Sequence, residues 1–321
     1  MPAVPLVRAV RSGFEESVNW GSVAVVDAGG RLVARAGDPE RVVFARSSMK
    51  PLQAAVSLRL AREDLTDTEV AVMCASHNGE PVHVEAVGRI LGRAGLDWDA
   101  LRCPPDRPLD PDHRVESPER RYHNCSGKHA GMLLASARRG YDPATYRDPG
   151  HPLQQEVLRA VKTVGGEPRS VGVDGCGVPV HALSLREMAT LYARLASGRG
   201  LGDLDRAGAR AVAAMGAAPY LVAGKDRVCT AVMEAVSGVI VKVGAEGLVC
   251  AGVAASGFGV AVKAEDGSAR AQAPAVVHAL EALGALDGAD HRSLERHARP
   301  PLLGGGEPVG HLEPVFRLQR V

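Results

Sequence analysis

A serine and a lysine three residues apart stand out in the segment Arg46–Pro51, which reads Arg-Ser-Ser-Met-Lys-Pro. Pro51 suits the first turn of a helix, where side chains three residues apart share one face, so the Lys50 amine could reach the Ser47 hydroxyl. A serine is a poor nucleophile until a base takes its proton, and a lysine whose pKa is lowered by burial can be that base. The spacing alone is also typical of an N-capping serine beside a solvated lysine.

Two further short motifs follow in chain order. Residues 76–78 read Ser-His-Asn, a Ser-x-Asn motif, and residues 242–244 read Lys-Val-Gly, a Lys-x-Gly motif on a predicted strand. With the Ser-x-x-Lys segment they resemble the three-part signature of serine β-lactamases and penicillin-binding proteins. In that signature the second serine relays a proton to the leaving group, and the glycine lets the substrate approach the strand edge. Taken singly, Ser76 could cap a turn and Lys242 could be a lysine whose amine reaches solvent from a strand end.

A second group of reactive residue types lies in two Gly-rich polar loops, one holding Cys125 with Lys128 and His129, the other Cys176. Thiolates are soft ligands suited to zinc, so Cys125, a neighbour on the same helix start and Cys176 could supply three ligands. A histidine, His129 or His123, is the more usual nitrogen ligand, because a lysine must be neutral to bind a metal. The alternative is a pair of free thiols beside the active site.

The composition limits the class of partner. The 321 residues carry 38 basic and 37 acidic side chains, a net charge of +1, which predicts neither a nucleic-acid footprint nor a polybasic membrane surface. The N-terminus lacks a basic segment followed by an apolar run, and no stretch has the length of a membrane span, so we expect a cytoplasmic protein that does not bind membranes. Six cysteines without a CxxC pair argue against a disulfide framework. A small-molecule partner is expected.

The elements that must position these residues follow from hydrophobic periodicity. Residues 21–46 predict a hairpin, Ser47 lies at a strand-to-helix junction, and residues 102–122 predict a long irregular loop. The remaining expected elements are helices at 82–93, 128–139, 153–164, 184–197, 205–215 and 273–286, strands at 238–243, 247–253 and 257–263, and a Pro/Gly-rich tail.

Strands, then helices, then strands indicate an α+β fold, an antiparallel sheet flanked by helices with a helix-rich middle segment. We expect the first and last segments to share one sheet, formed from about 5–46 and 238–265, with a helix-rich lobe at about 80–220. The whole chain, 1–321, is predicted to form a single catalytic domain.

Taken together, the motif blocks resemble the asparaginase II family, the rhizobial-type L-asparaginases. They span most of the chain in family order. The blocks are Arg46–Gln53, Cys74–Glu80, Asn124–Met132, Val173–Pro179 and Lys242–Gly247.

The resemblance implies a serine β-lactamase-like fold and hydrolysis of L-asparagine to L-aspartate and ammonia, usually by a homodimer. It implies two Ser-Lys pairs, Ser47 with Lys50 and Ser76 with Lys242; Lys263 on the following predicted strand is a rival for the last position. Further residues in the blocks are expected to contact the substrate, with Asp174 helping to hold its α-amino group or a metal-bound water. These residues are Arg46, His77, Asn78, Asp174 and Gly244.

The resemblance also implies a zinc ion that positions the substrate, held by Cys125, Lys128 and Cys176. It thus favours Lys128 over the histidines. Two other functions are compatible with the residues. One is a zinc-dependent amidohydrolase in which the metal activates water for attack on another small amide. The other is a non-catalytic module that binds a small molecule on a β-lactamase-like fold, for which two Ser-Lys pairs would have no use.

Overall fold

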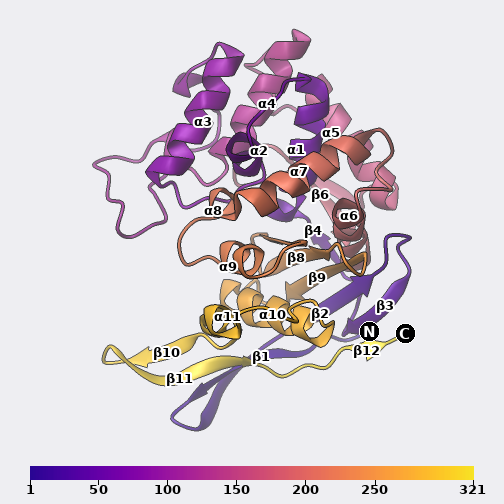
Figure 1. Cartoon of the computed structure of the whole chain (residues 1–321), viewed down its shortest axis with the longest axis vertical. Coiled ribbons are helices and arrows are strands. Elements are labelled where there is room, and N and C mark those ends of the chain that lie inside the picture. The colour runs from indigo at the N-terminus through magenta and orange to yellow at the C-terminus, as the bar shows by residue number, and fades with distance from the viewer. The chain divides into compact units, whose positions relative to one another are not determined.

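The computed structural model describes residues 1–321, except for the side chain of His291. The chain forms two compact units (Figure 1). The sheet unit contains residues 1–48, 183–200 and 231–321, and the helical unit contains residues 49–182 and 201–230. Each unit is therefore built from segments that are far apart in the sequence.

The sheet unit is organised around an antiparallel sheet of nine strands. The order runs from β10 through β11, β1, β2, β9 and β8 to β7, while β3 pairs with β2 and β12. Since β2 pairs with β9, the first and last segments share one sheet, as the sequence predicts. The strands are β1 (Val4–Arg11), β2 (Phe14–Val26), β3 (Leu32–Ala36), β7 (Val239–Val243), β8 (Leu248–Val253), β9 (Phe258–Ala264), β10 (Pro301–Gly304), β11 (Glu307–Pro314) and β12 (Gln319–Arg320).

Helices α6 (Leu185–Ser197) and α10 (Gln272–Ala282) both contact β8 and β9. Every residue of β8 is buried, so both faces of the sheet are covered at this strand. A capping box between Ser184 and Glu187 starts α6. A Cβ at Gly259 would lie 1.8 Å from the carbonyl oxygen of Ala189, so only glycine lets α6 approach β9 this closely. Helix α11 (His291–Ala298) packs against α10.

In the helical unit, α4 contacts four other helices, α1, α2, α3 and α5 (Figure 1). A Cβ at Gly127 would lie 2.1 Å from the carbonyl oxygen of Val72, so this glycine seats the start of α4 against α2. The helices are α1 (Lys50–Ala61), α2 (Asp67–Met73), α3 (Pro81–Ala94), α4 (Ser126–Arg139), α5 (Pro152–Gly165), α7 (Asp205–Ala217) and α8 (Pro219–Val222), beside the strand β5 (Ser170–Val173). Two elements run on from this unit into the sheet unit, β6 (Pro179–Ser184) and α9 (Val228–Ala235).

The observed elements confirm the α+β fold and most predicted boundaries. Helix α4 ends at Arg139 and is capped by Gly140, whose φ of 66° is left-handed, and residues 102–119 form no helix or strand. Two predictions were wrong. The helix expected to reach residue 286 ends at Ala282, and the tail after residue 300 forms β10, β11 and β12 rather than an irregular segment.

The tail could not be recognised locally, because its partner strand lies at the other end of the chain. Strand β11 pairs with β1, for example Val7 with Pro314. Strand β1 in turn pairs with β2 through a tight turn in which both Ser12 and Gly13 have positive φ, 49° and 82°. Such turns suit the twist of a hairpin.

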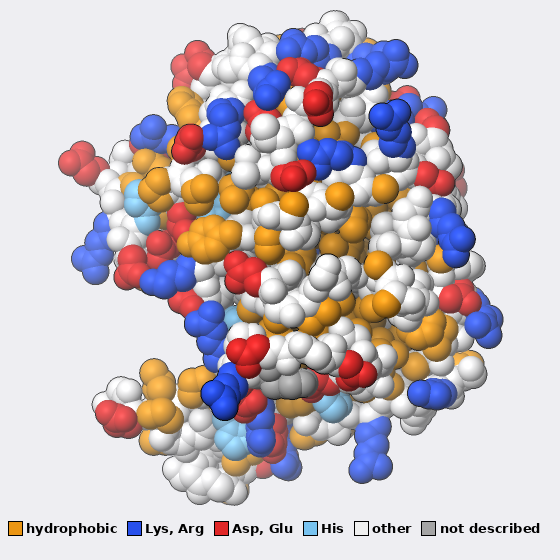
Figure 2. Space-filling view, in the orientation of Figure 1, with side chains coloured by type: hydrophobic (Ala, Val, Ile, Leu, Met, Phe, Trp, Pro, Cys, Tyr) orange, Lys and Arg blue, Asp and Glu red, His pale blue; other side chains and the backbone are white. Residues whose placement is uncertain are grey.

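Charged side chains are distributed without a single-sign patch on the face shown in Figure 2, where Lys and Arg alternate with Asp and Glu. Over the described residues, no helix is both long enough and apolar enough to cross a membrane.

Candidate functional site

Lys50 is the first residue of α1 and is fully buried. Its Nζ lies 2.6 Å from the carbonyl oxygen of Ala75, 3.3 Å from that of Asn124 and 2.9 Å from Ser76 Oγ. Burial lowers the pKa of Lys50, because desolvation disfavours the ammonium form. As an ammonium, Lys50 donates one N–H to each of these three oxygens; as a neutral amine it would keep two N–H groups for the carbonyls and offer its lone pair to the Ser76 hydroxyl. Lys50 can therefore act as a base towards a serine.

Residues 76–78 run as an extended segment with alternating backbone partners. The N–H groups of Ser76 and Asn78 donate to the carbonyls of Val222 and Ala223, whereas that of His77 donates to Asn124. Ser76 is therefore fixed from both sides, within the helical unit. This rigid support suits a hydroxyl that must hold its place beside a lysine.

The His77 side chain is fully buried, and burial lowers its pKa well below the usual value. Its Nδ1 accepts a hydrogen bond from the Gly79 N–H, so the proton of the neutral ring lies on Nε2, which contacts Ser126 Oγ at 3.0 Å. Both ring nitrogens are thus used inside the protein. The predicted contact of His77 with a substrate would require one of these bonds to break.

The Asn78 side chain is also fully engaged. Its Nδ2 donates to Glu80 Oε1 at 3.1 Å and to the Lys225 carbonyl at 3.0 Å, and its Oδ1 accepts from Arg227 Nη1 at 2.8 Å. An amide has two N–H donors, and both are used here. The predicted substrate contact of Asn78 would likewise compete with these internal bonds.

The two thiols predicted as metal ligands meet in the helical unit. Cys125 precedes α4, and its thiol is hydrogen-bonded to Cys176 in the loop after β5. Lys128 Nζ lies 3.0 Å from Cys176 Sγ, and Asp174 Oδ2 lies 3.8 Å from the same sulfur. The hydrogen bond from Cys125 lowers the pKa of Cys176, aided by Lys128, and that of Cys125 is raised. Burial would lower the pKa of Lys128, but the Cys176 thiolate raises it.

These side chains fit the zinc ion that the resemblance implies. Two soft sulfur donors and one amine converge, a donor set that zinc accepts. Among the described residues no group of three or more His, Cys, Asp or Glu side chains could hold a metal ion. A zinc site here would therefore depend on Lys128 as the third protein ligand, and binding would release the Lys128 proton.

The nucleophile predicted from the sequence lies in the sheet unit. Strand β4 (Val42–Phe44) leads into a 3-10 turn over Arg46–Met49, which confirms the strand-to-helix junction. Arg46 has a φ of 45°, a strained conformation for a residue with a side chain. Ser47 is half-buried, and within the described part of this unit no group hydrogen-bonds to its hydroxyl. A hydroxyl without a partner is available for reaction.

The end of β7 lies against this turn. Ser48 Oγ donates to the Lys242 carbonyl at 3.3 Å, and a Cβ on Gly244 would lie 2.9 Å from Ser48 Oγ. Lys242 is 1% exposed, and its Nζ donates to the Val243 carbonyl at 2.8 Å. Within the sheet unit, the Lys-x-Gly motif and the serine turn are therefore neighbours, as the three-part signature requires.

The rival lysine, Lys263, lies on β9 in a cavity of about 230 Å³ that Arg46 and Glu246 also line. Its Nζ donates to the Ala264 carbonyl, and burial lowers its pKa. Each predicted pair, Ser47 with Lys50 and Ser76 with Lys242, has one residue in the sheet unit and one in the helical unit. Both pairs stay predictions. The contact that the structure describes joins the lysine of the first predicted pair to the serine of the second.

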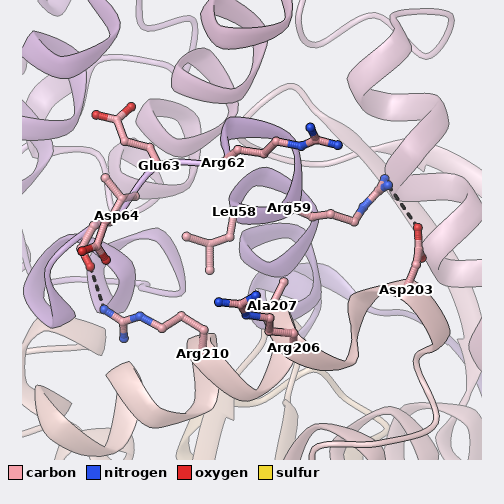
Figure 3. Close-up of a pocket in the computed structure, with 10 residues that line it drawn as sticks. Leu58, Arg59, Arg62, Glu63, Asp64, Asp203, Arg206, Ala207 and Arg210 are labelled. Atoms are coloured by element: carbon pink, nitrogen blue, oxygen red, sulfur yellow. Dashed lines mark hydrogen bonds and ion pairs between the residues drawn. The ribbon is translucent and has the colours of Figure 1, made fainter.

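A separate cavity of about 640 Å³ lies on the helical unit (Figure 3). It is lined by charged side chains, several of them paired, such as Arg59 with Asp203 at 3.1 Å. None of the residues predicted for the site lines it, so we do not assign it to the reaction.

Sequence reasoning missed two residues beside the Ser-x-Asn segment, Glu80 and Arg227. Glu80 is buried, and its carboxylate accepts from Asn78, from the Lys225 N–H and from the Tyr220 hydroxyl. Burial would raise the pKa of Glu80, but these hydrogen bonds lower it. Arg227 binds the Asn78 amide. The sequence signal was an acidic residue, Glu80, two positions after the Ser-x-Asn motif. This signal does not identify the distant residues that bind Glu80 or Asn78.

Comparison with solved structures gives loose similarities in fold. A β-lactamase from Mycobacterium bovis is 17% identical with a TM-score of 0.45, and the match covers 82% of this chain and 94% of that one. The protein Mglu in its native form is 14% identical with a TM-score of 0.40, over 81% of this chain and 63% of that one. No role of any residue follows from matches this distant. No protein with a curated description matches the sequence.

The family comparison is decisive, because it covers nearly the whole chain. The family model described as L-asparaginase II matches residues 7–314, which include all the motif blocks and both lysines of the proposed pairs. The chain belongs to the L-asparaginase II family and is an amidohydrolase of the asparaginase type.

Proposed function

We propose that the enzyme hydrolyses the side-chain amide of L-asparagine to give L-aspartate and ammonia. The observation that carries this proposal is the buried Lys50 amine, 2.9 Å from Ser76 Oγ and three residues after Ser47, with a pKa lowered by burial. A buried amine with a lowered pKa beside a serine hydroxyl is suited to proton transfer in acyl transfer to a serine. Membership of the L-asparaginase II family supports asparagine as the amide.

In the proposed reaction Lys50 accepts the proton of Ser47, whose oxygen attacks the amide carbon. Backbone N–H groups at the start of α1 stabilise the oxyanion. The C–N bond then breaks as a proton reaches the leaving nitrogen through Ser76, and ammonia departs from an ester with Ser47. Water attacks the ester, the proton returns to Ser47, and L-aspartate leaves. Lys242 would be paired with Ser76 and assist the proton transfer to the leaving nitrogen.

The remaining predicted residues have positioning roles in this proposal. Cys125, Lys128 and Cys176 would hold a zinc ion, which would act as a Lewis acid that orients the substrate. Asp174 would bind the α-amino group, and Arg46 would line the approach to Ser47. Gly244 would leave room for the substrate at the strand edge. Assembly as a homodimer stays a prediction.

Ammonia release tests the proposal on asparagine, glutamine, simple amides and a β-lactam. We expect the wild type to prefer asparagine, and Ser47→Ala to lose several orders of magnitude in kcat with an unchanged circular dichroism spectrum. Ser170→Ala, an exposed serine on β5, is the matched control and should keep full activity. A Ser47→Ala enzyme with near-wild-type kcat would refute the mechanism, and activity that vanishes entirely on chelation would favour zinc-activated water instead.

A further inference from the structure

The loop between α8 and α9 brings an arginine next to the Ser-x-Asn segment. The carbonyls of Val222, the last residue of α8, and of Ala223 accept from the N–H groups of Ser76 and Asn78, with N···O distances of 3.0 and 2.9 Å. Gly224 allows this approach, since its φ is 109° and a Cβ there would lie 2.4 Å from Glu80 Oε1. Three residues later the loop presents Arg227 to Asn78.

Arg227 is held by one hydrogen bond but has no charge partner. Its Nη1 donates to Asn78 Oδ1, and among the described residues no carboxylate forms an ion pair with its guanidinium. The nearby carboxylate of Glu80 is occupied by Tyr220, Asn78 and the Lys225 N–H. A guanidinium has five N–H donors in a planar fork, so most of them remain for a ligand.

The orientation of the Asn78 amide determines where the Arg227 guanidinium is held. Both Asn78 N–H groups face acceptors, so Oδ1 must point towards Arg227, and the amide cannot flip without losing all three bonds. Arg227 itself is half-buried, so it is reachable from solvent. Asn78 is thus a positioning residue for the guanidinium.

We propose that Arg227 binds the α-carboxylate of the amino acid substrate. This proposal rests on the proposed function. It identifies Arg227 as the group that recognises the α-carboxylate, the end of asparagine that does not react. Asn78 lies two residues from Ser76 on an extended segment, a chain length of about 7 Å. That span suits a substrate whose amide group lies at Ser76 while its carboxylate, three carbon atoms away, meets the guanidinium in a two-bond fork.

The test compares ligands that differ only in the α-carboxylate. L-asparagine and β-alaninamide form one pair, assayed by ammonia release, and L-aspartate and β-alanine form the other, assayed by calorimetry. Arg227→Gln should lower kcat/KM for asparagine and weaken aspartate binding by roughly 100-fold, the size expected for lost charged hydrogen bonds. The ligands without the carboxylate should change by less than about threefold. Arg227→Lys, which keeps the charge but not the fork, should fall in between.

Arg31→Gln is the matched control, because this exposed arginine pairs only with Asp27 near its own hairpin. It should leave all four measurements unchanged. An equal loss for both members of each pair would overturn the proposal, since it would mean that Arg227 supports the loop and does not read the carboxylate. A wild type that neither hydrolyses asparagine nor binds aspartate would overturn the proposed function itself, whatever Arg227 does.

Discussion

Two buried lysines of the helical unit, Lys50 and Lys128, have pKa shifts in opposite directions although both are removed from water. Lys50 is 0% exposed and Lys128 is 3% exposed, yet the pKa is lowered for the first and raised for the second. For Lys50, desolvation outweighs the opposing effects of Cys125 and Cys176, while two carbonyls and the Ser76 hydroxyl contact its amine. For Lys128, which lies 3.0 Å from Cys176 Sγ, the charges of Cys176, Cys125 and Asp174 together outweigh desolvation. The balance between desolvation and the charge of the neighbours therefore sets the direction of each pKa shift. One lysine is suited to accept protons and the other to hold an anion or a metal ion.

The largest effect should come from removing the proton acceptor. Lys50→Met is expected to reduce kcat on asparagine by about 10³-fold or more, because general-base catalysis is lost. Lys50→Arg should not restore activity, since a guanidinium stays protonated. Steady-state kinetics check this, with the exposed Lys162→Met as control. An active Lys50→Arg enzyme would show that Lys50 acts as a charge and not as a base.

The second lysine can be tested through stability. Cys176→Ser leaves the Lys128 ammonium buried without its anion, so we expect the free energy of unfolding of the metal-free protein to fall by about 3–5 kcal/mol in urea. Cys103→Ser is the control, because burial raises the pKa of Cys103 to about 12 and its thiol is neutral. Lys128→Met should recover part of the loss in the double variant. Equal losses for the two cysteine variants would contradict the ion pair.

A pH profile separates the two lysines further. If Lys50 must be neutral, kcat/KM should rise about tenfold per pH unit below its pKa and level off above it. Because that pKa is lowered, the plateau should begin below the ordinary lysine value of 10.5. Cys176→Ser should keep the single rise and plateau but move the plateau to lower pH, because the Cys176 thiolate raises the pKa of Lys50. A profile that continues to rise to pH 10.5 would mean that Lys50 is not desolvated in the working enzyme.

The smallest effect is expected from the metal. The purified wild type should contain about one zinc per chain, measured by elemental analysis, and Cys125→Ser should contain none. Chelation should raise KM by about tenfold, a loss of about 1.4 kcal/mol in binding, and leave kcat largely intact. Adding zinc should raise the melting temperature of the wild type but not of Cys125→Ser. A wild type that retains no zinc after dialysis would remove the metal from the proposal.

Local sequence patterns were sufficient for the longer helices and for the serine turn, but not for the short helices α2, α8, α9 and α11. Periodicity and caps give α3, α4 and α6 nearly to the residue, and the Ser-x-x-Lys spacing gives the start of α1. Contacts between residues far apart in the chain could not be predicted from local sequence patterns. The pairing of β11 with β1, the Arg227 bond to Asn78 and the contact of Lys50 with Ser76 each join residues that no periodicity relates. The pKa shift of Lys128 follows from such a contact too, so the sequence could name this lysine but not its charge.

Gly244 offers a simple way to sort related sequences. A methyl group there would lie within 3 Å of the Ser48 hydroxyl, so alanine at this position would push the turn that carries Ser47. A relative that keeps both serines and lysines but replaces this glycine is expected to have lost or rebuilt the reaction. One small residue on a strand could thus distinguish working enzymes from inactive descendants before any assay is run.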